Sequence, residues 1–183
     1  MESTIKLNKN IVCDYQIERK SPNIPSLEIL RRSLNDKDDI CYPYNHALIG
    51  QIMQPHQPLP NTLTLDPGVI IHQTKSIHLC ARQHLVFQGL FMAAPVIKLE
   101  AAVIELIDSG DPEEPITTIA AQTRLVLNAH EVFFNGVALR CYDAAIDCRA
   151  KTIRYANIDL QELQKTAKFP PSCKFLEVEV VDD

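Results

Sequence analysis

The sequence predicts an α+β domain in which a coiled antiparallel β-sheet wraps a helix, and three observations point to it. Residues 96–107 are almost entirely apolar and rich in β-branched side chains, and turn-forming residues follow at 109–112. Residues 119–127 alternate between apolar and polar side chains, which is typical of a half-buried strand. Residues 137–141 repeat that alternation. Three strands in sequence with short connections indicate an antiparallel meander.

Length and composition favour one domain spanning residues 1–183, since 46% of the residues are hydrophobic. The net charge is −5 and the Lys and Arg residues are scattered, which does not favour nucleic-acid binding, because neutralising phosphates requires clustered basic residues. No stretch reaches the roughly 20 apolar residues of a membrane-spanning helix. We therefore expect a cytoplasmic protein that binds neither nucleic acid nor membrane.

The N-terminal part is expected to hold one strand and two short helices. Residues 11–17 alternate like a strand with one polar face. Pro25 can open a first helix, and residues 47–53 show helical spacing until Pro55 stops the run. Residues 69–81 fit either a strand or a helix, and their content of Thr, Val and Ile favours the strand.

The later part continues the sheet and closes with a helix and an edge strand. The phase of the polar residues changes near Val103, which predicts a bulge. The hairpin reversal can lie either at the Asn135-Gly136 dipeptide or at residues 128–131. Asp159 with Glu162 three residues on forms a capping-box pattern that predicts a C-terminal helix, and residues 174–181 alternate like an edge strand. No internal repeat is expected.

Cysteine and histidine spacing does not favour a metal site. The six cysteines show no CxxC pair and no secretory signal, so we expect buried free thiols. His72, His78 and His84 recur every six residues, which would place them on one face of a continuous strand. Metal ligands on strands more often lie two residues apart, and Gly68 and Gly89 interrupt this run. Partly exposed sheet histidines, with no metal and no cofactor, are the expectation.

Residues 76–141 resemble the sheet portion of hotdog-fold acyl dehydratases of the MaoC-like group, and residues 47–53 look like the wrapped helix of that group. The family's Asp-x-Asn-Pro-x-His motif is replaced here by Asp39 followed by Pro-Tyr-Asn-His at residues 43–46. A second alignment, with the helix start of β-hydroxyacyl carrier-protein dehydratases, places Gln73 at the catalytic Glu position. The resemblance implies a hotdog-like fold, an acyl-thioester ligand and a homodimer.

By this resemblance the protein binds an acyl thioester of coenzyme A or acyl carrier protein and hydrates or dehydrates it, as a hydro-lyase of fatty-acid or polyketide-type metabolism. His46 would be the base and Asp39, or the adjacent Asp38, the acid, because the reaction moves one proton α to the carbonyl and one at the β-hydroxyl. The substrate-orienting residues would be Tyr42, Tyr44 and Asn45. An acyl-CoA thioesterase and a non-enzymatic small-molecule-binding domain are the alternatives.

Overall fold

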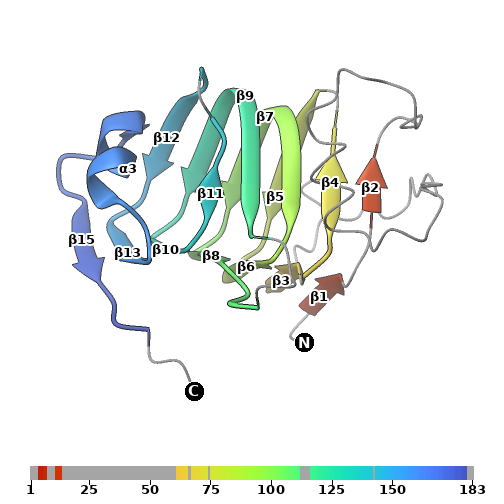
Figure 1. Ribbon diagram of the computed structural model, residues 1–183, viewed down its shortest axis with the longest axis horizontal. Helices are drawn as coiled ribbons and strands as arrows, with labels where there is room; N and C mark the ends of the chain where they lie inside the picture. Colours follow the sequence, from red (N-terminus) through yellow and green to blue (C-terminus); the bar gives the residue numbers. More distant parts are fainter. Residues whose placement is uncertain are drawn as a thin grey trace.

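In the computed structural model the chain winds into a β-solenoid and passes repeatedly between two sheets. Every strand pairing among the described residues is parallel. Figure 1 shows the strands stacked along the long axis, from β1 and β2 at one end to β15 at the other. The structure describes residues 4–7, 11–13, 61–65, 67–73, 75–111, 116–141 and 143–180.

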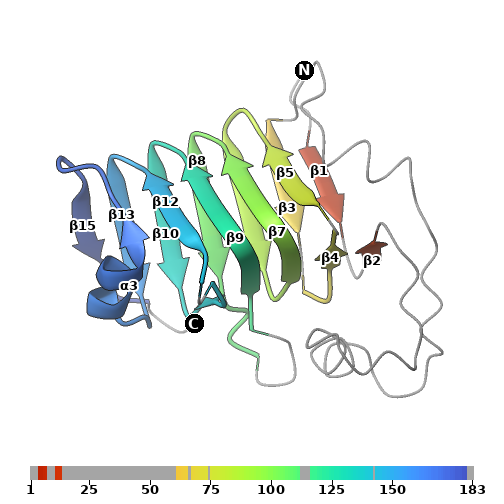
Figure 2. The same ribbon diagram turned by 90° about the horizontal axis from the view of Figure 1, so that it is seen from above.

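Two sheets run the length of the solenoid, and Figure 2 shows their strands side by side from above. Sheet A has the order β1 (Thr4–Leu7), β3 (Thr62–Leu65), β6 (His84–Gln88), β8 (Val103–Ile107), β10 (Glu131–Asn135), β13 (Thr152–Ala156), β15 (Lys174–Glu177). Sheet B has the order β2 (Ile11–Cys13), β4 (Ile70–His72), β7 (Phe91–Glu100), β9 (Thr118–Asn128), β12 (Ala145–Arg149), β14 (Ala167–Lys168). Two further strands of sheet B pair beside this path, β5 (Ser76–Cys80) with β7 and β11 (Ala138–Leu139) with β9.

The long strands of sheet B are bent. β7 pairs with β4 over its first residues and with β5 over Val96 to Glu100. The register of β7 with β9, its neighbour on the other side, shifts between Ala94 and Val96. β9 pairs in the same way with β11 and then with β12. A bulge of this kind turns a strand without ending it. One continuous strand in β7 therefore matches two separate strands in the preceding coil.

Four of the corners at which the chain passes from sheet B to sheet A carry an alanine. The N–H of Ala81 donates to the carbonyl of Glu100 at 3.0 Å, that of Ala101 to Asn128 at 3.2 Å, and that of Ala129 to Arg149 at 3.3 Å. Inward-facing apolar residues stand two and four positions before each of these alanines and before Ala150. The four corner alanines are Ala81, Ala101, Ala129 and Ala150, spaced by 20, 28 and 21 residues. The chain therefore has an internal repeat, and the expectation of none is wrong.

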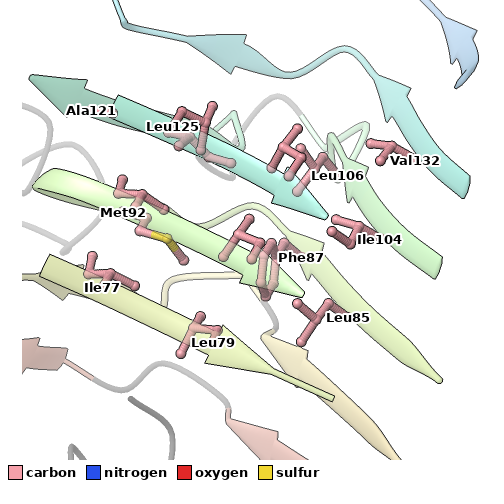
Figure 3. Close-up of a cluster of buried hydrophobic side chains, with 14 of the residues drawn as sticks. Ile77, Leu79, Leu85, Phe87, Met92, Ile104, Leu106, Ala121, Leu125 and Val132 are labelled. Atoms are coloured by element: carbon pink, nitrogen blue, oxygen red, sulfur yellow. The ribbon is translucent and has the colours of Figure 1, made fainter. Parts of the chain in front are cut away.

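The core fills the space between the two sheets. Leu85, Phe87, Ile104 and Leu106 of sheet A face Ile77, Leu79, Met92 and Leu125 of sheet B in Figure 3, and all eight are fully buried. Residues of sheet A that pair in register are large and apolar in each successive coil, so the apolar core runs along the solenoid from coil to coil. The stacked partners are Leu63, Leu85, Ile104, Val132, Ile153 and Phe175.

The coil between β8 and β10 is closed by a buried threonine. Ile104 and its partner Val132 are separated by 28 residues, whereas Leu63 and Leu85 are separated by 22. In this longer coil Thr117 is fully buried, and its Oγ1 accepts from the N–H of Gly89 at 2.7 Å and donates to the carbonyl of Ile107. The hydroxyl satisfies two backbone groups that the insertion would otherwise leave unpaired.

The hotdog-like α+β prediction and the MaoC-like resemblance are wrong, because the strands are parallel and the sheets belong to a solenoid. Apolar alternation arises in any sheet with one buried face, so it does not distinguish parallel from antiparallel pairing. At each alanine corner the chain moves to the other sheet, and neighbouring strands come from successive coils. Among the described residues the single helix is α3 (Leu160–Thr166), between β13 and β14.

Several local predictions are confirmed. Asp159 caps α3, and its Oδ1 accepts from the N–H of Glu162 at 3.1 Å. Residues 69–81 form strands, β4 and β5, and β15 ends sheet A. The bulge predicted near Val103 is instead the corner at Ala101, and the two candidate reversals are both turns to the other sheet.

The described part of the chain contains no helix of the length and apolarity needed to cross a membrane. The helices expected between residues 25 and 53 lie outside the described residues.

Candidate metal centre

Three side chains that bind metals in other proteins meet on the outer face of sheet B. In β5 the side chains of Ile77 and Leu79 are fully buried, so the alternate residues His78 and Cys80 point outward on the same face. Glu100, the last residue of β7, is the register partner of Cys80. The parallel register between successive coils therefore brings a carboxylate beside the imidazole and the thiol.

The donor atoms of this cluster lie close together. His78 Nε2 is 2.6 Å from Glu100 Oε2 and 3.1 Å from Cys80 Sγ, and the thiol donates to Glu100 Oε2 at 3.6 Å. All three donor atoms lie within 4.8 Å of one another. Within the described ranges, this is the one group of three or more His, Cys, Asp or Glu side chains with that property.

The carboxylate of Glu100 is held by partners on both sides. Its Oε1 accepts from Asn128 Nδ2 at 3.0 Å and lies 3.0 Å from Lys98 Nζ, while Oε2 faces His78. Partial burial raises the pKa of Glu100, but hydrogen bonds from Asn128, His78 and Lys98 outweigh it and lower the pKa to about 2. Glu100 is thus ionised at neutral pH and oriented toward the other two donors.

Cys80 carries its proton at neutral pH in the absence of a cation. Desolvation by burial, followed by the negative charge of Glu100, raises the pKa of Cys80 to about 11. A bound metal ion reverses this balance, because a coordinated thiol is deprotonated outright.

A Cys-His-Glu catalytic triad does not fit this geometry. In such a triad the histidine contacts the nucleophile through one ring nitrogen and the acid through the other. Here the thiol and the carboxylate both contact Nε2 of His78. The raised pKa of Cys80 also opposes nucleophilic reactivity, because the thiolate is the reactive form.

Zinc coordination fits the same atoms with small movements. Tetrahedral bonds of ~2.0–2.3 Å place nitrogen, oxygen and sulfur donors roughly 3.3–3.6 Å apart. The Cys80 Sγ to Glu100 Oε2 distance is already 3.6 Å. The His78 ring must separate from the other two donors by less than about 1 Å, which is within the range of side-chain rotation.

A groove of about 530 Å³ runs from this cluster along the alanine corners. Cys80 and Glu100 form one end of it, and its volume is in the range of small-molecule sites. Further along, the polar lining residues are Asn128, His130, Arg149, Lys151 and Ser172.

The hotdog resemblance assigned five residues to the site, and all five lie outside the described residues. They are Asp39, Tyr42, Tyr44, Asn45 and His46. Gln73, the counterpart of the catalytic Glu in the second alignment, is buried directly after β4 and does not line the groove. The hydratase, thioesterase and small-molecule-binder hypotheses stay untested predictions, and the fold that suggested the acyl-thioester ligand is not the one observed.

Sequence reasoning considered His78 but missed its partners. The spacing of two between His78 and Cys80 was the available signal, since ligands on strands use that spacing. Cys80 was instead predicted to be a buried thiol, whereas it is partly exposed. Glu100 enters only through the register of neighbouring coils.

Comparison of the chain with protein-family models, with curated proteins and with solved structures found no match.

Proposed function

We propose that this protein binds a divalent transition-metal ion of the zinc class through His78 Nε2, Cys80 Sγ and Glu100 Oε2. The observation that supports the proposal is the convergence of these three donor atoms within 4.8 Å. Three protein ligands leave a fourth tetrahedral position for water or a ligand, which is the pattern of catalytic rather than structural zinc sites.

The donor set discriminates among metals. Thiolate and imidazole ligands suit zinc and its neighbours in the transition series, whereas calcium and magnesium prefer sites built from oxygen. The carboxylate of Glu100 and the thiolate of Cys80 together neutralise a divalent charge. Monovalent copper, which favours sulfur-rich sites, is matched less well by one thiolate among three donors.

The solenoid supports the site on a rigid surface. Ile77, Leu79 and Leu99 alternate with the ligands in β5 and β7, and all three are fully buried. Asn128 and Lys98 fix the other oxygen of Glu100. Ligands carried on packed strands are held more precisely than ligands on loops, which favours metal affinity.

The test is a zinc titration of the metal-free full chain in competition with a chromophoric chelator. We expect about one equivalent of zinc per chain at this site, with bound metal confirmed by elemental analysis. His78→Ala, Cys80→Ser and Glu100→Gln should each weaken zinc binding by at least about 100-fold, because each removes a direct ligand.

Matched substitutions outside the cluster control for residue type. His84→Ala, Cys173→Ser and Glu105→Gln remove the same kinds of side chain at positions that do not contribute to the donor group. These three variants should keep the zinc affinity of the unmodified chain. Equal zinc affinity in the cluster variants and in the unmodified chain would refute the proposal.

A further inference from the structure

The groove beside the candidate metal centre follows a row of residues that lie immediately before the corner alanines. Cys80 pairs in register with Glu100, Glu100 with Asn128, and Asn128 with Arg149. Neighbouring strands in a sheet are about 4.8 Å apart, so Arg149 lies roughly 10 Å from Glu100 at the level of the backbone. A ligand that touches both ends must therefore be elongated across the coils.

The two ends of the groove have different charges. The metal-centre end has the carboxylate of Glu100, and the far end has Arg149 and Lys151, with no Asp or Glu among the residues that line it there. Arg149 lies 3.5 Å from Asp147, and Arg124 contacts the same carboxylate oxygen at 2.5 Å, so two guanidinium groups share one negative charge. The far end therefore keeps a net positive charge.

A bound metal would make the metal-centre end of the groove electrophilic. A metal held by this cluster would border the groove, because Cys80 and Glu100 both line it. Guanidinium and ammonium groups recognise carboxylates and phosphates through charge-assisted hydrogen bonds. An electrophilic metal at one end and positive charge at the other end of a groove of about 530 Å³ select a small molecule with an anionic group at each end.

We infer that the groove binds a small elongated dianion, one anionic group coordinating the metal and the other contacting Arg149 and Lys151. This inference rests on the proposed metal site. It adds the chemical class of the ligand and two residues, Arg149 and Lys151, that determine specificity.

Cobalt-loaded protein provides the assay, because the visible absorption of cobalt responds to a ligand entering its coordination sphere. Adipate carries a carboxylate at each end, and hexanoate is matched in chain length but carries one. Adipate should bind at least about tenfold more tightly than hexanoate, as expected for one added charge-assisted contact. In the double variant Arg149→Gln/Lys151→Gln this advantage should disappear while cobalt affinity is unchanged.

The matched control is Lys75→Gln/Lys165→Gln, which removes the same charge from exposed positions outside the groove. It should keep the preference for adipate. Cobalt binding without a preference for adipate, or a preference that survives in the groove variant, would overturn the inference and leave the metal site standing. Absence of cobalt binding would refute both.

Discussion

Metal binding should release a countable number of protons. In the metal-free chain Cys80, with a pKa of about 11, keeps its proton at neutral and mildly alkaline pH. Glu100, with a pKa of about 2, has already lost its proton. Coordination of the thiolate therefore releases about one proton for each metal ion, and Glu100 contributes none.

This count fixes the pH dependence of affinity. Release of one proton per ion makes the apparent zinc affinity rise about tenfold for each pH unit, as long as the free thiol stays protonated. The sign follows from the raised pKa of Cys80, since alkaline pH lowers the cost of forming the thiolate. Between about pH 7.5 and pH 9 we expect a rise of roughly 30-fold.

Calorimetric titrations in buffers of different ionisation enthalpy measure the proton count directly. Cys80→Ala should bind zinc weakly and release close to no thiol proton, whereas Cys173→Ala should behave like the unmodified chain. The reasoning fails if the unmodified chain releases no proton, or if Cys80→Ala releases the same number.

Two further predictions concern the solenoid itself and are measured by urea unfolding. Gly136 has a φ of +64°, and a Cβ there would lie 2.9 Å from the Cβ of Asp108, whereas Gly110 has a φ of +73° and open space. Gly110→Ala should cost about 1 kcal/mol of unfolding free energy from backbone strain alone, and Gly136→Ala about 1–3 kcal/mol more; equal costs would contradict the contact. Thr117→Val should cost about 1–3 kcal/mol, because the buried N–H of Gly89 loses its acceptor, and an unchanged unfolding midpoint would show that this hydrogen bond is dispensable.

Local features were predictable from the sequence because they depend on neighbouring residues. Ile119, Leu125 and Leu127 are buried on one face of β9, as their alternation predicted. Asp159 caps its helix through a hydrogen bond to the N–H of Glu162, three residues later in the chain. Side-chain period and capping chemistry act over a few residues, so they can be read without knowing the fold.

Strand direction could not be obtained in this way. The outward and inward positions of a strand follow the same alternation in a solenoid and in an antiparallel meander. The distinguishing signal was the recurrence of alanine between pairs of inward apolar residues, as at Ala81, Ala129 and Ala150. The longer coil between Ala101 and Ala129 breaks the regular spacing and hides that repeat.

The candidate site was hidden for the same reason. His78 and Cys80 are near in sequence, but Glu100 belongs to the next coil and reaches them through register alone. Unless the solenoid winding is known, the sequence does not indicate that Glu100, 20 residues after Cys80, lies beside it. The site becomes visible once parallel stacking is known.

Because His78 and Cys80 lie on one coil and Glu100 on the next, a coordinated ion would act as a clamp across a boundary between stacked units. Each coil of a solenoid contacts mainly its neighbouring coils, so two adjacent coils can separate locally without global unfolding. With metal bound, separation of β5 from β7 would require breaking coordination bonds first. Backbone amides along that seam should therefore exchange with solvent more slowly in the loaded protein than in the metal-free one.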